Sequence, residues 1–266
     1  MKRSIIAIFC MGVLFSSCKN EEKNEAISET ELTAEVDQEM ETSNATLEIE
    51  PISHATALLK WGDAVIYTDP VGGADVFEGK AAPSFVLITD IHGDHMDAKT
   101  LEALNLGDTK IIVPKAVKDQ LPKEMEANLI VMNNGDTKEI MGFSIKAIPM
   151  YNLPEAKDAM HTKGRGNGYV VEKEGQRLYI SGDTEDIPEM RDLENIDVAL
   201  ICMNLPYTMT VEDAADGVLA FAPKKVYPYH YRGKDGLADV SKFKDLVNKG
   251  SKEIEVVQLN WYPEMK

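Results

Sequence analysis

Cysteine and basic side chains are both scarce in this chain of 266 residues. It contains three cysteines, and its 28 lysines and arginines are outnumbered by 45 aspartates and glutamates, which gives a formal net charge of −17. So few cysteines exclude the disulfide framework that is typical of small secreted domains. A surface this acidic repels phosphate groups, so nucleic acid is excluded as the expected partner.

Long apolar segments are scarce as well, and one of the few lies at the N-terminus. Ile5–Phe15 follows Lys2 and Arg3 and is too short to span a bilayer as a mature helix. A positive start before a short apolar core is the pattern of a secretion signal. The residues that follow, Phe15-Ser16-Ser17-Cys18, resemble the cleavage box of bacterial lipoproteins, with Phe15 where leucine is usual.

We therefore expect residues 1–18 to be a lipoprotein signal peptide, with Cys18 as the lipidated N-terminus. An ordinary signal peptide cut near Ser17 and an uncleaved anchor are the alternatives. The expected location is the bacterial cell envelope, anchored by lipid in the outer membrane on its periplasmic or surface side. Cys202, within the apolar run 198–202, then remains as the single thiol and is expected to be a small buried side chain.

Residues 19–46 carry nine acids and two lysines, without aromatic residues, glycine or proline. This composition predicts a disordered tether. An acidic segment directly after the lipidated cysteine resembles the surface-export signals of some Gram-negative lipoproteins. Residues 47–266 show no repeat, membrane span or second domain, and with 44% hydrophobic residues in the chain they are expected to form one domain.

Apolar runs and turn signals predict the elements of this domain. Strands are expected at 56–61 and 64–68, joined by a hairpin turn at Gly62-Asp63, and at 85–89, 110–114, 129–132, 143–150, 177–181, 197–202, 225–229 and 255–259. Helices are expected near 97–104, from Thr210 to Ala222 and at 240–249. Between them, 151–166 is a long irregular segment, and loops of this length in compact domains are usually functional.

The stretch Asp90-Ile91-His92-Gly93-Asp94-His95 carries four potential metal ligands within six residues, at the exit of the strand expected at 85–89. If the chain stays extended at first, the first two ligands project to the same side. The glycine then allows a turn that directs the last two to a second point nearby. Such a loop offers two ligands to each of two ions roughly 3.5–4 Å apart, a recurrent arrangement for activating water.

A simpler interpretation of the same stretch is an acidic loop between a strand and a helix. In that case Asp94 or Asp97 only caps the helix near 97–104. Two histidines among the four side chains, in a chain with five histidines in all, favour the metal interpretation.

The stretch 90–95 resembles the His-x-His-x-Asp-His signature of the metallo-β-lactamase superfamily, with Asp90 in place of the first histidine. Later positions resemble the further motifs of this superfamily in the expected order. His161, in His161-Thr162-Lys163-Gly164, resembles the third motif, Asp183 after Gly182 resembles the fourth, and His230 after 225–229 resembles the fifth. The alternatives are a surface histidine on a loop for His161 and a helix cap before 187–191 for Asp183.

Two further segments resemble the branch of the superfamily that includes ascorbate-6-phosphate lactonase and the N-acylphosphatidylethanolamine phospholipase D. These are His54-Ala55-Thr56 and Asp69-Pro70-Val71. Within this resemblance, Asp69 lies behind the metal loop and orients a ligand, although it is equally compatible with a turn residue before proline. His54 precedes its strand and is expected in the wall of the active site or beside a ligand, not as a ligand itself.

The resemblance implies an α/β fold, the four-layer αβ/βα sandwich, over residues 47–266, with the site at one edge between the two sheets. It implies two divalent ions, Zn, Mn or Fe. Asp90, His92 and His161 would bind one ion, Asp94, His95 and His230 the other, and Asp183 would bridge both. A hydroxide between the ions would be the nucleophile, so Asp94 and Asp183 count as catalytic residues together with His54 and Tyr207. Tyr207 is equally compatible with plain packing.

Asp90 is the position where this chain departs from the superfamily pattern. An added carboxylate makes the two-ion core neutral, whereas a histidine would leave it at +1, and carboxylate favours harder ions such as Mn²⁺ or Fe²⁺ over Zn²⁺. The main functional hypothesis is a metal-dependent hydrolase of a small-molecule phosphodiester, lactone or other ester. The alternative is a non-catalytic, surface-anchored binding protein on a degenerate metal scaffold. Neither the substrate nor the oligomeric state is encoded in a readable way.

Overall fold

The computed structural model describes residues 46–263. The expected signal peptide at 1–18 and the expected tether at 19–46 therefore lie outside the described residues, except for Thr46. Within 46–263, no helix combines the length and the apolar character needed to cross a bilayer.

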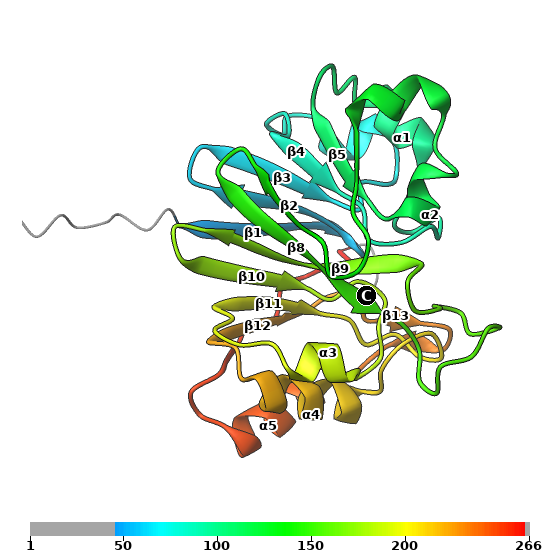
Figure 1. The fold of residues 1–266 in the computed structure, drawn as a ribbon. Coiled ribbons are helices and arrows are strands. Elements are labelled where there is room, and N and C mark those ends of the chain that lie inside the picture. Colours follow the sequence, from blue (N-terminus) through cyan, green and yellow to red (C-terminus); the bar gives the residue numbers. More distant parts are fainter. Residues whose placement is uncertain (1–45, 264–266) are drawn as a thin grey trace, which may run out of the picture. The chain divides into compact units, whose positions relative to one another are not determined.

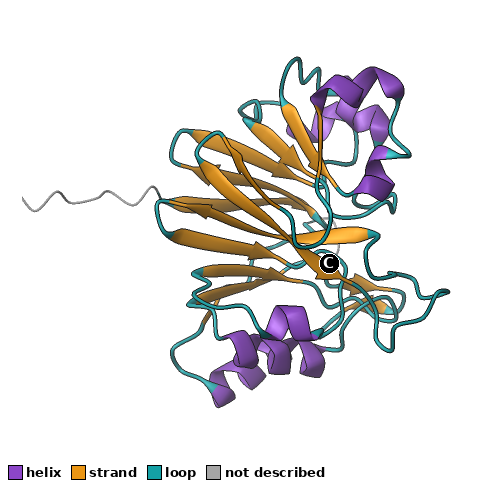
Figure 2. Ribbon diagram, viewed as in Figure 1, coloured by secondary structure: helices purple, strands orange, loops and turns teal. Residues whose placement is uncertain are grey.

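Two β-sheets pack against each other, and each carries helices on its outer face (Figures 1 and 2). The first sheet contains six strands in chain order: β1 (Leu47–Ser53), β2 (Thr56–Trp61), β3 (Ala64–Thr68), β4 (Phe85–Leu87), β5 (Lys110–Val113) and β6 (Leu129–Val131). The first three strands are antiparallel, and β3 to β6 run parallel. Its outer helices are α1 (Ala98–Ala103) and α2 (Lys115–Lys118), and the 3₁₀ turns η1 (Ala74–Phe77) and η2 (Lys123–Asn128) lie in its connections.

The second sheet contains seven strands in the order β15-β12-β11-β10-β9-β8-β7. These are β7 (Thr137–Ile140), β8 (Phe143–Met150), β9 (Gly166–Lys173), β10 (Gln176–Ile180), β11 (Val198–Ile201), β12 (Lys225–Pro228) and β15 (Glu255–Val256). Strands β7 to β10 are antiparallel, and β10, β11, β12 and β15 run parallel. Helices α3 (Pro188–Arg191), α4 (Val211–Phe221) and α5 (Val240–Gly250) cover it, and a small hairpin pairs β13 (Arg232–Gly233) with β14 (Gly236–Leu237).

Both faces of the first sheet are buried, which explains its continuous apolar strands. Successive side chains point to opposite faces of a strand. Leu59 and Phe85 pack into the core between the sheets, whereas their neighbours Leu58 and Val86 pack under the outer helices with Leu101. The four-layer αβ/βα architecture expected from the sequence is confirmed.

The expected elements are found with small shifts at their ends. The strands expected at 85–89 and 255–259 are shorter, ending at Leu87 and Val256. Helix α1 is capped by Asp97, whose side chain accepts from the Lys99 N–H, and α4 is capped by Thr210. Strands β1, β7, β9, β13 and β14 were not expected. Leu47–Glu50 in β1 does alternate between apolar and acidic residues, whereas β7 is mostly polar, β9 opens with two glycines, and β13 and β14 have two residues each.

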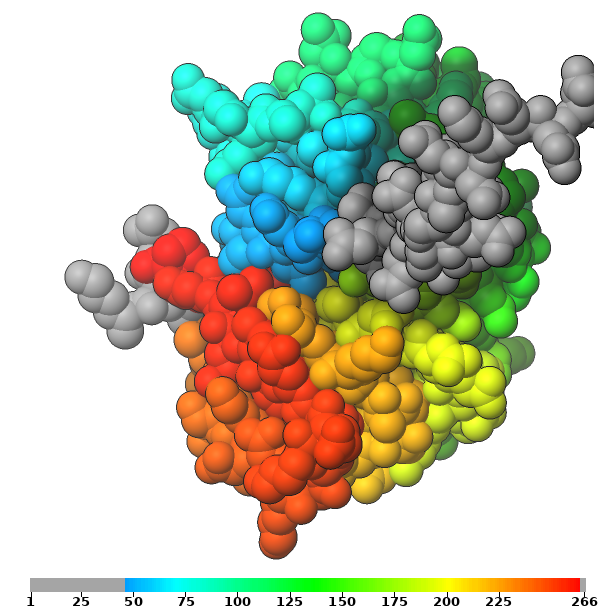
Figure 3. All heavy atoms as spheres, turned by 90° about the vertical axis from the view of Figure 1, so that its left-hand side faces the viewer, coloured from blue at the N-terminus to red at the C-terminus, as the bar shows by residue number. Residues whose placement is uncertain are grey.

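The ends of the domain meet beside the site. The backbone N–H of His54 donates to the Trp261 carbonyl at 3.4 Å, and the backbone N–H of His230 donates to the His54 carbonyl at 3.3 Å. In Figure 3, red C-terminal residues lie beside blue residues from the start of the domain. The loops that leave β4, β8, β10 and β12 open at the same edge, where ligands of α/β sheets commonly bind.

Candidate metal centre

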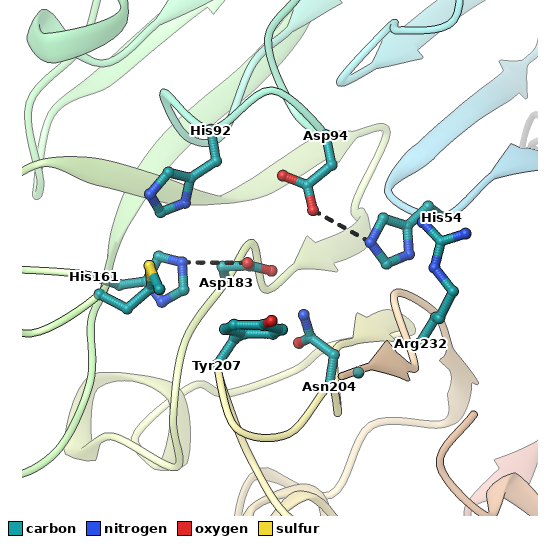
Figure 4. A pocket seen from close by; sticks show the side chains of 10 residues that line it. His54, His92, Asp94, His161, Asp183, Asn204, Tyr207 and Arg232 are labelled. Carbon is teal, nitrogen blue, oxygen red and sulfur yellow. Dashed lines mark ion pairs between the residues drawn. The ribbon is translucent and has the colours of Figure 1, made fainter. Parts of the chain in front are cut away.

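All five histidines of the chain gather at this edge with four aspartates, and Figure 4 shows those that line the cleft. His54 lies in the turn between β1 and β2, and the ligand-rich loop 90–95 follows β4. His161 lies in the loop between β8 and β9, Asp183 follows β10, and His230 follows β12. The structure therefore brings together all seven residues expected as ligands, from four separate loops.

We call Asp94, His95 and His230 the second triad. The His95 and His230 Nε2 atoms are 3.1 Å apart, and the Asp94 Oδ2 atom lies 3.4 Å from the His230 Nε2 atom. His95 and His230 are fully buried, whereas 42% of the Asp94 side chain is exposed to the cleft. The carboxylate of this triad thus faces the solvent-filled cleft, and both imidazoles are buried.

We call Asp90, His92 and His161 the first triad. The His92 Nδ1 atom lies 2.8 Å from the Asp90 Oδ2 atom, and the His161 Nε2 atom lies 3.8 Å from the same oxygen. His92 is 31% exposed, whereas Asp90 and His161 are buried. Two residues of this triad follow the end of β4, and the third comes from the long loop 151–165.

Asp183 lies between the two triads. Its Oδ2 atom is 3.2 Å from the His161 Nε2 atom and 3.4 Å from the His95 Nε2 atom, and its Oδ1 atom is 3.5 Å from the His230 Nε2 atom. Gly182 places it there with a φ of +61°, and a Cβ atom at Gly182 would lie 2.7 Å from the Met150 sulfur. The alternative role as a helix cap does not apply, because α3 is capped by Ile187.

Three side chains of the centre, His95, Asp94 and Asp183, have pKa values shifted toward their charged forms. Burial alone would raise the pKa of Asp183, but His230 and His95 hold it well below its ordinary value. Burial alone would lower the pKa of His95, but the carboxylates of Asp183 and Asp69 raise it well above its ordinary value. Burial likewise opposes ionisation of Asp94, yet hydrogen bonds with His230 and His54 lower its pKa. The centre is therefore built for positive charge among ionised carboxylates.

Asp69 orients His95 from behind. The Asp69 Oδ2 atom lies 2.9 Å from the His95 Nδ1 atom and accepts from the Thr89 hydroxyl at 2.6 Å, and Oδ1 accepts from the Thr89 N–H at 2.7 Å. The carboxylate therefore holds an imidazole proton on Nδ1, so Nε2 is the nitrogen that faces the site and would ligate an ion once its own proton has left. Of the two roles expected for Asp69, the structure places it in the orienting one.

His54 is hydrogen-bonded on both sides of its ring, and the sequence did not indicate its partners. The Tyr262 hydroxyl accepts from the backbone N–H of Arg232 at 3.1 Å and lies 2.6 Å from the His54 Nδ1 atom. The ionised Asp94 carboxylate can only accept, so the His54 Nε2 atom, 3.2 Å from the Asp94 Oδ2 atom, carries a proton and donates it. Burial lowers the pKa of His54 and favours the neutral ring, so Nδ1 accepts from the Tyr262 hydroxyl. His54 is within ligand distance of Asp94 and His230, but this tautomer makes it a donor to Asp94.

Three residues around the second triad have left-handed backbones. The φ angles are +55° at His54, +44° at Asp69 and +48° at His230. Such conformations cost non-glycine residues about 1–3 kcal/mol each and persist only where the surrounding structure enforces them. The fold therefore places backbone strain beside the second triad.

Arg165 changes the charge balance expected from the sequence. Its Nη2 and Nε atoms donate to the two Asp90 oxygens at 2.9 Å and 3.2 Å, which is a bidentate ion pair. The extra carboxylate at position 90 is thus paired with a cation, which the charge count made from the sequence left out. Sequence reasoning missed Arg165, although it lies four residues after His161 in the loop already expected to be functional.

The geometry fits divalent ions on two observations. In a tetrahedral site with metal–nitrogen distances near 2.1 Å, ligand atoms lie about 3.4 Å apart, and the distances between His95, His230 and Asp183 are 3.1 Å, 3.4 Å and 3.5 Å. Several buried ring and carboxylate atoms also have no hydrogen-bond partner, namely both ring nitrogens of His161, the His230 Nδ1 atom and the Asp183 Oδ1 atom. Buried polar atoms without partners are costly, and an ion would satisfy those that face the site.

The centre opens into a cleft of about 340 Å³. Its lining residues are His54, His92, Asp94, Met160, His161, Asp183, Asn204, Tyr207, Arg232 and Gly233. Tyr207 lies in this lining, where a catalytic residue but not a plain packing residue has to lie. Asn204 and Arg232 were not expected, because neither carries a recognisable sequence pattern. Cys202 is buried and its thiol donates to the Thr184 carbonyl at 3.4 Å, as expected for a packing residue.

Comparisons with known proteins identify the family and the fold of this chain. Residues 48–230 match the family model described as the beta-lactamase superfamily domain. A UPF0173 metal-dependent hydrolase of Thermococcus kodakarensis is 31% identical over 206 residues, which cover 74% of this chain and 90% of the relative. The crystal structure of a Parabacteroides distasonis protein described as a metal-dependent hydrolase is 38% identical, with a TM-score of 0.70, and the match covers 80% of this chain and 92% of that one. Igni18, a metallo hydrolase of Ignicoccus hospitalis, shares the fold at 23% identity, with a TM-score of 0.68 over 80% of this chain and 95% of its own.

The fold and the clustered histidines and aspartates thus define a metallo-β-lactamase superfamily protein. Within that superfamily, the chain belongs to the UPF0173 metal-dependent hydrolases. It is a metal-dependent hydrolase with the metallo-β-lactamase fold.

Proposed function

We propose that this hydrolase holds two divalent ions and cleaves a small-molecule phosphodiester, lactone or other ester. The observation that carries the proposal is the position of Asp183 between two triads at the base of a cleft. The first triad would hold one ion, the second triad the other, and Asp183 would contact both. Divalent ions bound in this way acidify water and polarise an ester oxygen.

The protein groups then have distinct tasks. Hydrolysis joins a water oxygen to the phosphorus or acyl carbon, breaks the bond to the leaving oxygen and transfers a proton to that oxygen. Asp94, partly exposed to the cleft and oriented by the His54 Nε2–H, is placed to receive the proton of the water. The hydroxyl of Tyr207 in the opposite wall is placed to donate to an oxygen of the substrate.

Asp90 supports a preference for Mn²⁺ or Fe²⁺ over Zn²⁺, because carboxylate is a harder ligand than imidazole. The pairing with Arg165 lessens this preference, since the guanidinium shares both carboxylate oxygens. The same ion pair favours the alternative function, a binding protein whose first triad no longer takes an ion.

The test compares metal content and turnover. The protein is stripped with chelator, reloaded with Zn²⁺, Mn²⁺ or Fe²⁺, and assayed for metal per chain and for hydrolysis of bis(p-nitrophenyl) phosphate, a γ-lactone and p-nitrophenyl acetate. We expect two ions per chain and turnover of at least one substrate class, reduced about 100-fold or more by Asp183→Asn. Asp192→Asn, the same change at an exposed position, should have no effect. Full metal loading without turnover of any substrate would favour the binding protein.

We also propose that the protein is held at the cell envelope by lipid on Cys18, on the strength of the sequence at 15–18. Cys18→Ser should release the protein from membranes or leave it unprocessed. A variant that fractionates and migrates like the wild type would contradict the anchor.

A further inference from the structure

One wall of the cleft contains none of the expected ligands and presents hydrogen-bond donors instead. Asn204 and Tyr207 lie side by side on it, and the Arg232 side chain lies at its end beside His54 (Figure 4). Among the described residues the Tyr207 hydroxyl has no hydrogen-bond partner, and the Asn204 Oδ1 atom accepts from the Thr208 hydroxyl. The Asn204 amide N–H groups therefore remain available to a molecule in the cleft.

The wall is held rigidly by contacts between two loops. A Cβ atom at Gly233 would lie 2.0 Å from the Leu205 carbonyl oxygen, so only glycine allows the loops to approach this closely. The Lys234 N–H donates to the same carbonyl at 2.9 Å. The Arg232 N–H is fixed by the Tyr262 hydroxyl at 3.1 Å. The backbones that carry the three donors are therefore positioned relative to each other before any ligand binds.

Arg232 is unusual for its charge. It is the only lysine or arginine among the residues that line the cleft, in a chain with a net charge of −17. Within residues 46–263 it forms no ion pair, and its Cζ atom lies 5.5 Å from the centre of the Tyr262 ring. A guanidinium held over an aromatic face keeps its N–H groups free for a ligand. An acidic protein that presents this cation at its cleft has a local means of attracting anions that its overall charge repels.

We propose that Arg232, Asn204 and Tyr207 bind an oxyanion of the substrate, so that the preferred substrates are esters with a carboxylate or phosphate group. The planar guanidinium matches either oxyanion with two parallel hydrogen bonds. The Asn204 amide and the Tyr207 hydroxyl are neutral donors for the remaining oxygens. This assignment rests on the proposed hydrolase function and narrows its substrate class to anionic esters.

The first experiment compares substrates that differ in one negative charge. One pair is p-nitrophenyl hydrogen glutarate and its neutral methyl ester, and the other is bis(p-nitrophenyl) phosphate and its neutral methyl triester. In the metal-loaded enzyme, Arg232→Gln should lower kcat/KM about 10- to 100-fold for the anionic member of the preferred pair and less than about 3-fold for the neutral member. The pair with the larger loss identifies the oxyanion as carboxylate or phosphate.

Lys234→Gln is the matched control, because it removes the same charge from the same hairpin outside the cleft lining. We expect no more than about a 3-fold change for any substrate. Equal losses for charged and neutral substrates in Arg232→Gln, or a Lys234→Gln effect of the same size, would overturn the proposal while leaving the hydrolase function intact.

A binding measurement separates this proposal from the hydrolase function. Glutarate and phenylphosphonate, which are not hydrolysed, are titrated calorimetrically into the metal-loaded protein. We expect Kd for one of them to rise about 10- to 100-fold in Arg232→Gln, with partial recovery in Arg232→Lys. Thermal melting of each variant checks folding. If no ester is turned over but the Arg232-dependent binding is present, the hydrolase function fails and the anion site stands. If the wild type binds neither anion, or Arg232→Gln binds as well as the wild type, the anion site is wrong.

Discussion

The two triads differ in how firmly the fold holds them. In the second triad both histidines are fully buried, Asp69 orients His95, and His54 orients Asp94. In the first triad His92 is 31% exposed, and Asp90 is shared with Arg165. The second triad is thus oriented by neighbouring groups that are themselves held by hydrogen bonds from Thr89 and Tyr262, whereas the first has a ligand that already carries an ion pair.

This difference suggests that one ion site is preorganised and the other is adjustable. Groups behind a ligand typically contribute 10- to 100-fold to metal affinity. The strained backbones at His54, Asp69 and His230 lie beside the second triad alone. We therefore expect tight binding at the second triad, and weaker, more selective binding at the first.

The largest effect should come from removing His95 of the second triad, and removing His92 of the first triad provides the comparison. His95→Ala leaves the buried Asp69 carboxylate without its charged partner, which costs about 3–5 kcal/mol of unfolding free energy in comparable buried pairs. His92→Ala should cost less than about 1 kcal/mol, because His92 is partly exposed and Asp90 keeps Arg165. Chemical denaturation of the metal-free proteins measures both. Equal losses would remove the distinction between the triads.

The next effect concerns metal stoichiometry. His161→Ala should reduce bound metal from two ions to one per chain while circular dichroism stays unchanged, because His161 comes from a loop and makes no side-chain hydrogen bond that holds the fold. Metal analysis after dialysis checks this expectation. Two ions retained at unchanged affinity would place the third ligand elsewhere, at Tyr151 or Asn152.

Asp90 and Arg165 should shift the pH dependence in opposite directions. Asp90→His removes a negative charge beside the site, and this removal makes it easier for bound water to lose a proton. The acid limb of activity should therefore move to lower pH. The affinity for Zn²⁺ relative to Mn²⁺ or Fe²⁺ should rise about 10-fold. Arg165→Gln removes a positive charge, so the acid limb should move to higher pH. Activity from pH 5 to 10 and competitive metal titration measure both shifts. An unshifted profile and unchanged metal preference in Asp90→His would show that Asp90 does not ligate.

The smallest effect should be at Cys202, behind the site. Burial raises the pKa of its thiol to about 11, above the ordinary value of 9.0, so less thiolate is present at pH 8 than on an exposed cysteine. We expect slow labelling by a disulfide reagent in the folded protein, rapid labelling after denaturation and full activity in Cys202→Ala. Rapid labelling of the native protein, measured against Cys202→Ala, would contradict the burial.

Sequence reasoning reached most of the fold because its signals are local. Strands β2, β3 and β8 have continuous apolar runs or a clear alternation of apolar and polar residues, and their expected bounds match the structure. Strand β7 was missed because it is short and mostly polar, and β9 because it opens with Gly166-Asn167-Gly168; both are held in place by pairing with β8. The metal-site residues were found because they follow strand ends in an order that resembles a known pattern.

Some parts of the site depend on contacts between residues far apart in the chain. Arg165 lies 75 residues from Asp90, and Tyr262 lies 208 residues from His54, so nothing local indicates either pair. The donor wall likewise requires Gly233 to meet Leu205 across two loops.

By itself, then, the sequence determined the order of the strands and helices that it made recognisable and a set of seven residues suited to metal ions, and its resemblance to a known superfamily implied the αβ/βα sandwich. Hydrophobic periodicity and residue chemistry are properties of short segments, so they can be read without a structure. The tertiary structure alone decided how the charge at Asp90 is balanced, which proton His54 carries, and that a free cation stands at the cleft. Each of these depends on distances between loops, and only packing of the two sheets sets those distances.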